Sequence, residues 1–140
     1  MSKSFMFAAL TALIWGFAPA FEKLGLDGKI DPYLGVVIRS IPVAVIAFVG
    51  LAVMGRTASI ATVDLKSALL VAAGGLIAGL LGQLAFYSAL KYGEASVAVP
   101  VAATYPLVAL VVSVVFLGES FTVQKLVGIG LVVGGVVLLK

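Results

Sequence analysis

The sequence predicts an all-α integral membrane protein with five membrane-spanning helices and with its N- and C-termini on opposite sides of the membrane. Of its 140 residues, 63% are hydrophobic and only 11% are charged. Soluble domains contain about 45–50% apolar and about 25% charged residues. The few charged residues cluster between long apolar stretches. Because so little polar surface is available to face water, the surplus apolar residues are expected to contact lipid.

Five apolar stretches are expected to form the spanning helices of a single domain over residues 1–140. They cover about residues 5–22, 33–54, 68–90, 95–117 and 123–139. Each has roughly 17–23 residues, which suits a helix crossing a hydrocarbon core of about 30 Å. Barrel strands would alternate apolar and polar positions, whereas positions of both parities are apolar here.

Residues at the ends of these stretches favour the same division. Asp31, followed by proline, suits the start of the second helix, because proline is favoured in a first turn. Gly93 and Gly118 are expected to end the third and fourth helices. Thr122 or Ser120 is expected to cap the fifth.

The first stretch has a second interpretation as a cleavable signal peptide. Lys3, an apolar run and the small residues around Pro19 resemble such a segment. Trp15 within the run, and Glu22 with Lys23 directly after it, favour a retained spanning helix instead.

The composition also argues against several functions. The chain has no Cys and no His, so a thiolate nucleophile, an Fe–S cluster and a histidine base are excluded. No enzyme activity, cofactor or metal site is therefore expected. The net charge of +3 is scattered along the chain, whereas a nucleic-acid binder gathers its basic residues on one face.

Basic residues are divided evenly between the two predicted sides of the membrane. Lys3, Arg56, Lys66 and Lys125 fall on one side, and Lys23, Lys29, Lys91 and Lys140 on the other. The positive-inside rule therefore barely selects an orientation. Either the insertion machinery or loop folding sets a single orientation, or copies insert both ways and pair as an antiparallel homodimer.

Arg39 is the one full charge expected well inside a span, about seven residues after Pro32. An arginine near a helix centre costs roughly 2.5–3.5 kcal/mol on insertion scales, so it normally faces a cavity or a partner. Snorkelling to the headgroups is the alternative. Glu22 and Glu119 are expected at helix ends and Glu94 in a loop. This placement argues against cation export coupled to a buried glutamate, unless Glu22 lies deeper in the span.

Several other polar residues are candidates for a substrate pathway. Gln83 and Tyr87 lie one helical turn apart and share a face; an interhelical hydrogen bond and substrate binding explain them equally well. Thr104 and Tyr105 are the corresponding candidates in the fourth helix, and Trp15 in the first.

Helix-breaking residues accompany these polar groups. Pro100 and Pro106 each remove a backbone donor and are expected to free the carbonyls of Ser96 and Ala102. Exposed carbonyls of this kind occur in transporter binding sites, although a kink needed only for packing is the alternative. Gly16, after Trp15, and Pro19 are expected to give the first helix a similar weak point.

Glycines at helical spacing are expected to serve helix packing or dimerisation. Small residues at this spacing let neighbouring helices approach closely in a membrane. The candidates are Gly75 and Gly79 in the third helix, with Gly128, Gly130 and Gly134 in the fifth. The fifth helix has almost no polar atoms, so a scaffold role is favoured for it.

Several short motifs follow one another along the chain. They are Leu13-Ile14-Trp15-Gly16-Phe17 with Lys23, Arg39, Tyr87-Ser88-Ala89-Leu90-Lys91-Tyr92-Gly93, Pro100 with Tyr105-Pro106-Leu107, and Phe116-Leu117-Gly118-Glu119 followed by Gly128 and Gly134. In their order and spacing they resemble an EamA-type domain of the drug/metabolite transporter superfamily. No one motif is specific, but together they cover essentially the whole chain.

The resemblance implies a five-helix half-unit of a transporter that moves small metabolites, often amino acids, out of the cell. Larger relatives fuse two such units as an inverted repeat, so a lone half-unit would need an inverted partner. A multi-pass protein of the cell inner membrane is therefore expected, exporting an amino-acid-like or related metabolite by alternating access. The alternative is a non-transporting accessory or scaffold subunit of a larger membrane complex.

Overall fold

The computed structural model describes residues 2–138, and helices make up most of this part of the chain. No strand occurs among these residues, which confirms the helical fold class. Four stretches are long and apolar enough to cross a membrane: Lys3–Leu26, Pro32–Val53, Leu65–Tyr92 and Ala95–Phe116. A shorter apolar helix follows at Val123–Val137. The predicted end of the fifth helix at residue 139, and Lys140, lie outside the described residues, and five complete spans stay a prediction.

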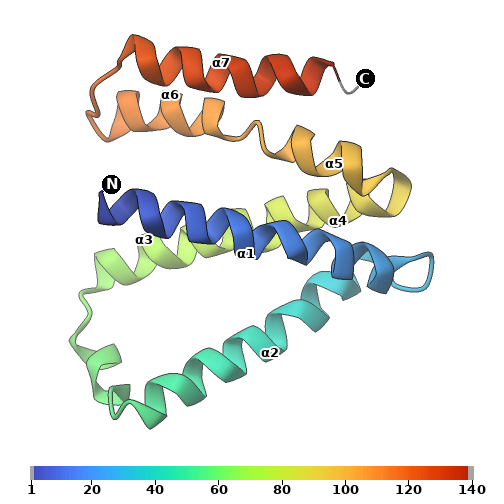
Figure 1. The fold of residues 1–140 in the computed structure, drawn as a ribbon. Coiled ribbons are helices and arrows are strands. Elements are labelled where there is room, and N and C mark those ends of the chain that lie inside the picture. The colour runs from blue at the N-terminus through green and yellow to red at the C-terminus, as the bar shows by residue number, and fades with distance from the viewer. Residues whose placement is uncertain (1, 139–140) are drawn as a thin grey trace. The chain divides into compact units, whose positions relative to one another are not determined.

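The chain divides into two compact units, Met1–Tyr92 and Gly93–Lys140. The first unit holds α1 (Lys3–Leu26), α2 (Pro32–Val53), a short 3₁₀ helix η1 (Thr57–Thr62), α3 (Leu65–Gly75), a π-helix η2 (Leu76–Gly82) and α4 (Gln83–Tyr92). The second holds α5 (Ala95–Ala102), α6 (Pro106–Phe116) and α7 (Val123–Val137). Figure 1 labels α1 to α7 along the chain. The single domain expected over residues 1–140 stays a prediction.

Side-chain caps fix the starts of four helices. Asp31 accepts hydrogen bonds from the backbone N–H groups of the first turn of α2, at 2.8 and 3.2 Å, and Thr122 accepts one from Lys125 at 3.3 Å. Both caps confirm the prediction. Ser2 caps α1 and Asp64 caps α3 in the same way. Hydrogen bonds from Ser67 hold the pKa of the Asp64 carboxyl below its ordinary value.

Glycines with positive φ follow the ends of three helices. Gly28, with φ +69°, follows the end of α1 at Leu26. Gly55 and Gly118, both with φ +66°, follow the ends of α2 and α6. A left-handed residue here is the usual helix stop, and glycine adopts it without steric cost. Because α1 continues to Leu26, Glu22 lies one turn inside the helix rather than at its end.

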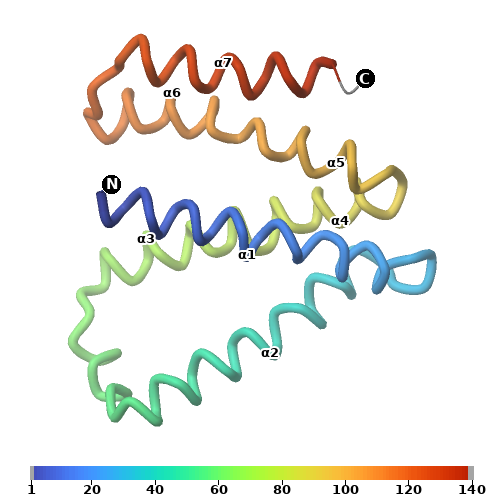
Figure 2. The backbone as a smooth tube through the Cα atoms, in the orientation of Figure 1, coloured from blue at the N-terminus to red at the C-terminus, as the bar shows by residue number. Residues whose placement is uncertain are grey.

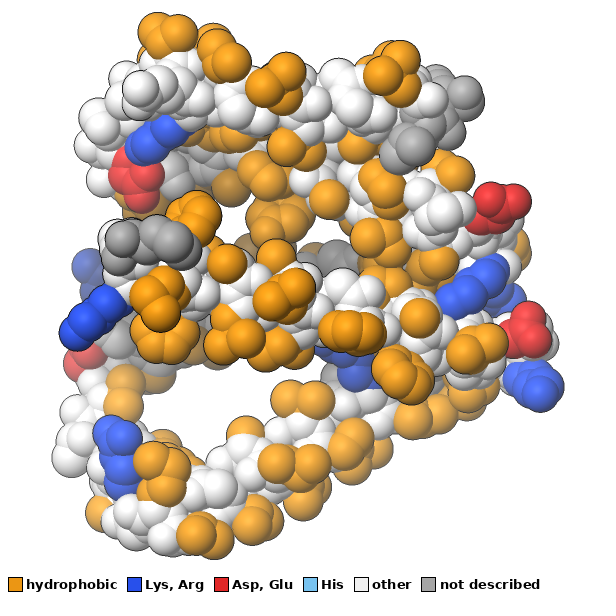
Figure 3. All heavy atoms as spheres, in the orientation of Figure 1, with side chains coloured by type: hydrophobic (Ala, Val, Ile, Leu, Met, Phe, Trp, Pro, Cys, Tyr) orange, Lys and Arg blue, Asp and Glu red, His pale blue; other side chains and the backbone are white. Residues whose placement is uncertain are grey.

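In the first unit, α4 packs against both α1 and α2. Leu26, Val36, Tyr87 and Leu90 form the buried apolar core at this junction. The backbone trace shows α2 diverging from α3 as α2 runs toward Val53 (Figure 2). The described helices otherwise present large apolar side chains on their outer surfaces, as expected for contact with lipid (Figure 3).

In the second unit, the predicted break in the fourth helical stretch is present. The regular helix is interrupted at residues 103–105, and Pro106 takes the first turn of α6. The expectation of a freed carbonyl at Ala102 is wrong, because this oxygen accepts a hydrogen bond from the Tyr105 N–H at 3.1 Å. The hydroxyl of Thr104 in turn donates to the Val101 carbonyl at 2.7 Å. The break is therefore satisfied by local hydrogen bonds.

Candidate functional site

One carboxylate oxygen connects three helices of the first unit. Oε1 of Glu22, on α1, accepts a hydrogen bond from the Tyr87 hydroxyl at 3.0 Å and from Nε2 of Gln83 at 3.4 Å. Nε of Arg39, on α2, lies 3.4 Å from the same oxygen. The Glu22 side chain is only 14% exposed, while that of Arg39 is 43% exposed. We call Glu22, Arg39, Gln83 and Tyr87 the Glu22 cluster.

Helical spacing explains why α4 contributes two members of the cluster. Gln83 and Tyr87 lie four residues apart, so both side chains project from the same face of α4. The π-helix η2 ends immediately before Gln83. Because a π-helix has a different number of residues per turn from an α-helix, it changes which face the next segment presents, and such segments often occur at functional sites.

A glycine lets α2 approach α4 at the cluster. A Cβ atom built on Gly35 would lie 2.9 Å from Cδ2 of Tyr87 and 3.0 Å from Cδ2 of Leu26. Real Cβ contacts are essentially never shorter than 3.0 Å. Gly35 therefore allows Tyr87 to occupy the position in which its hydroxyl reaches Glu22.

Lys23 provides a second connection between α1 and α4. Its Nζ donates a hydrogen bond to the backbone carbonyl of Leu90, in the last turn of α4. Carbonyls of the last helical turn have no partner within the helix, so a lysine here satisfies an acceptor and complements the helix dipole. The contact holds α1 against α4 close to Glu22.

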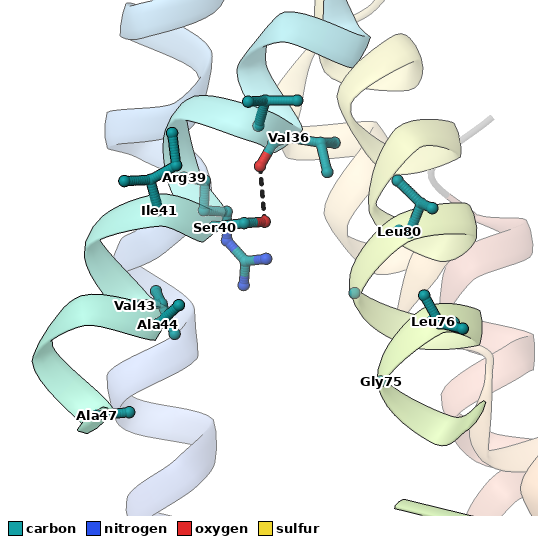
Figure 4. A pocket seen from close by; sticks show the side chains of 12 residues that line it. Val36, Arg39, Ser40, Ile41, Val43, Ala44, Ala47, Gly75, Leu76 and Leu80 are labelled. Carbon is teal, nitrogen blue, oxygen red and sulfur yellow. Dashed lines mark hydrogen bonds between the residues drawn. The ribbon is translucent and has the colours of Figure 1, made fainter. Parts of the chain in front are cut away.

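A groove of about 660 Å³ lies between α2 and the segment formed by α3 and η2. Its walls are mainly apolar and small, with Val43, Ala44 and Ala47 on α2 facing Gly75, Leu76, Gly79 and Leu80. Figure 4 shows the guanidinium of Arg39 projecting from α2 into this space. The hollow beside α2 is also visible in the space-filling view (Figure 3).

Arg39 also borders a second, smaller cavity. This cavity, of about 140 Å³, is lined by Glu22, Tyr87 and Arg39 together with apolar residues around Gly35. Arg39 is therefore the member of the Glu22 cluster that also borders the apolar groove. Of the described residues that line the groove, Arg39 is the only charged one.

The structure brings three of the predicted pathway residues together and places the others elsewhere. Arg39, Gln83 and Tyr87 all contact Glu22. Trp15 lies on α1 two turns before Glu22, is 64% exposed and lines neither cavity. Thr104 and Tyr105 belong to the second unit. The role of each in a substrate pathway stays a prediction.

The predicted packing glycines have open space beside them in the part of the chain that the structure describes. There, a Cβ atom built on Gly75, Gly79, Gly128, Gly130 or Gly134 would meet no atom within 4 Å, and the same holds for Gly16. Gly75 and Gly79 line the groove instead. Their part in dimerisation stays a prediction, as does any gating role of Gly16, Pro100 and Pro106.

Sequence reasoning missed Glu22 as a member of the site. The residue directly follows the last large apolar residue of the first stretch, Phe21, so the helix was expected to end there. The signal that could have found it is Asp27 followed by Gly28, a typical helix stop. Extending the helix to that glycine places Glu22 within its last two turns, where the side chain can contact neighbouring helices.

Comparison with known proteins identifies the family. The sequence profile of the EamA-like transporter family matches residues 2–140. The chain belongs to this family. EamA-like proteins are membrane transporters of the drug/metabolite superfamily, so membership points to a multi-pass membrane transporter rather than an enzyme. No solved structure gives a significant match.

Two curated relatives of this EamA-like chain differ in how much of it they cover. One is a protein of Sinorhizobium sp. described as an uncharacterized transporter in the cobO 3' region. It is 26% identical over 140 residues, and the match covers 99% of this chain and 98% of the relative's length. An uncharacterized protein of Methanocaldococcus jannaschii is 37% identical over 60 residues, covering 43% of this chain and 44% of its own. The chain thus matches less than half the length of the archaeal relative.

Proposed function

We propose that this EamA-like chain is a secondary transporter that exports a small metabolite, amino-acid-like or related, across the cell inner membrane by alternating access. The observation that carries the proposal is the Glu22 cluster beside an open groove, within a chain whose helices are otherwise almost wholly apolar. Charged side chains inside membrane proteins are costly and mark substrate or ion pathways. Glu22 and Arg39 are the charged members of that pathway.

We further propose that two copies work as an antiparallel homodimer. Five spans would place the two ends of one copy on opposite sides, so an inverted second copy is required to reproduce the inverted repeat found in larger relatives. The even division of lysine and arginine supports insertion in both orientations. A Cβ atom built on Gly128, Gly130 or Gly134 of α7 would meet nothing within 4 Å among the described residues, which leaves these glycines available to a second copy.

Transport by the purified chain in liposomes tests the proposed function. A panel of labelled amino acids and short carboxylic acids is expected to contain at least one solute that the unaltered chain moves and that Arg39→Gln moves about tenfold more slowly or worse. This factor corresponds to the loss of one charge-assisted hydrogen bond. Lys125→Gln, which removes the exposed partner of Glu119, is the matched control and should retain the rate.

The contrary result is transport of no solute together with unchanged export from cells that carry Arg39→Gln. That combination would favour the accessory subunit over the transporter.

Orientation in the membrane gives a separate test of the antiparallel dimer. Reporters active on only one side of the membrane, fused to the C-terminus, are expected to give comparable signals from both sides, within about threefold, because the basic residues are balanced. Adding two lysines to one connection should bias the signals strongly to one side. Signal from a single side in the unaltered chain would contradict dual insertion.

A further inference from the structure

The groove carries one charged group, and its geometry indicates which ligands it accepts. Nε of Arg39 lies 3.4 Å from Oε1 of Glu22. Charge-assisted N–H···O contacts are typically about 2.7–2.9 Å, so this ion pair is long. Among residues 2–138 the structure gives no partner to the two terminal nitrogens of Arg39. Figure 4 shows the guanidinium directed into the groove.

The terminal nitrogens of an arginine form a planar fork that matches an oxyanion with two oxygens. An oxyanion in the groove can therefore bind Arg39 while Nε still faces Glu22. Should the ligand draw the guanidinium away, Glu22 keeps the hydrogen bonds from Tyr87 and Gln83 and is not left without donors. When Arg39 moves from Glu22 to the oxyanion, both Glu22 and Arg39 therefore keep polar partners.

The rest of the groove favours a ligand whose remaining part, beyond the oxyanion, is apolar. Apart from Arg39 and Ser40, its walls are built from alanine, valine, leucine and isoleucine side chains and from two glycines. The one other polar side chain on the wall, Ser40, donates its hydroxyl to the Val36 carbonyl at 2.7 Å. None of the described lining residues is acidic, so a ligand cation would find no counter-charge on the walls.

We propose that the groove binds a singly charged organic oxyanion, with the oxyanion on the terminal nitrogens of Arg39 and the apolar part between α2 and η2. The inference rests on the proposed transport function and narrows the substrate of the same site, from an amino-acid-like or related metabolite to one that carries an oxyanion and no cationic group. A single charge is required because one guanidinium faces the groove and Glu22 already lies beside it. Water-soluble carboxylates and the headgroups of anionic lipids both have this chemistry.

Calorimetric titration of the purified full-length chain in a neutral detergent tests the proposal, with hexanoate as the probe. Hexanoate is expected to bind saturably, whereas hexanamide and hexylammonium are expected to bind at least tenfold more weakly. Arg39→Gln should weaken hexanoate binding by tenfold or more. Glu22→Gln should strengthen it by several-fold, because removing the neighbouring carboxylate charge removes its repulsion of the ligand. Lys125→Gln should leave it unchanged.

A second variant tests the apolar part of the site without touching the charged cluster. Ala47 lies on the groove wall away from Glu22, with its side chain directed into the groove (Figure 4). Ala47→Phe should reduce the preference for hexanoate over acetate by about tenfold, because the larger side chain fills space needed by the hydrocarbon.

Binding to the chain in nanodiscs of two lipid compositions then distinguishes the two sources of ligand, a soluble carboxylate and a lipid headgroup. A loss of hexanoate binding in phosphatidylglycerol, relative to phosphatidylcholine, that exceeds the depletion of the anion by the charged bilayer surface identifies the lipid headgroup. A loss no larger than this depletion identifies the soluble carboxylate.

Equal binding of hexanoate, hexanamide and hexylammonium, or hexanoate binding that survives Arg39→Gln, would overturn the proposal. Transport of a cation or neutral solute in liposomes without hexanoate binding would refute this substrate class and leave the transporter standing. Hexanoate binding without transport of any solute would support the oxyanion site and contradict the proposed transport function.

Discussion

Glu22→Ala is expected to lower the free energy of unfolding by about 2–3 kcal/mol. The change removes the acceptor for Tyr87 and Gln83 and leaves the Arg39 guanidinium without its carboxylate. Leaving buried donors and a partly buried charge without partners costs more than losing a surface contact. Unfolding by sodium dodecyl sulfate, followed by circular dichroism in mixed micelles, measures the difference.

The second glutamate ion pair of the described chain is the matched control. Glu119 lies 3.5 Å from Nζ of Lys125, and both side chains are well exposed, at 52% and 40%. Exposed pairs contribute about 0–1 kcal/mol. Equal losses for Glu22→Ala and Glu119→Ala would mean that the Glu22 cluster contributes no more than a surface ion pair.

Gly35→Leu is expected to disrupt the junction of α2 with α4. Even the first added carbon would lie 2.9 Å from the Tyr87 ring, so either the ring or α2 must move. Overpacking of a core typically costs about 1–3 kcal/mol, and here it also separates the Tyr87 hydroxyl from Glu22. We expect a loss of about 3 kcal/mol in the same unfolding assay, and at least tenfold slower transport.

Gly50, also on α2, provides the control for that substitution. A Cβ atom there would meet nothing within 4 Å, so Gly50→Leu adds the same side chain to the same helix without a clash. It should change stability by less than about 1 kcal/mol, the scale of a helix-propensity difference. A comparable loss at both glycines would show that the close approach at Gly35 is not what stabilises the junction.

Local chemistry explains which features the sequence alone could predict. Asp31 and Thr122 act within their own helical turns, so their capping roles follow from nearby residues. The pairing of Gln83 with Tyr87 on one face follows from a spacing of four residues. Arg39 could be recognised as costly to place in a membrane. This cost indicates that Arg39 has a polar partner, but it does not identify the partner residue.

The partner itself depends on tertiary structure. Glu22 and Tyr87 are 65 positions apart, and they meet because α1 and α4 pack together. The π-helix at Leu76–Gly82 and the close approach at Gly35 have no counterpart in the apolar pattern of the sequence, which is uniform across both segments. A hydrophobic pattern indicates that a segment lies in lipid, but in a chain with so few polar residues it does not indicate which faces meet.

A double-mutant cycle on transport tests most directly whether Glu22 and Arg39 act as one site. The rate is measured in liposomes for the unaltered chain, Glu22→Gln, Arg39→Gln and the combined variant, with the solute that the unaltered chain moves fastest. Arg39→Gln is expected to slow transport about tenfold because it removes the contact with the ligand, and Glu22→Gln about tenfold because the ligand is held more tightly and released more slowly. Without Arg39 there is no tightly held ligand for Glu22→Gln to affect, so the combined variant is also expected to lose about tenfold. A hundredfold loss in the combined variant, the product of two independent effects, would contradict a shared site.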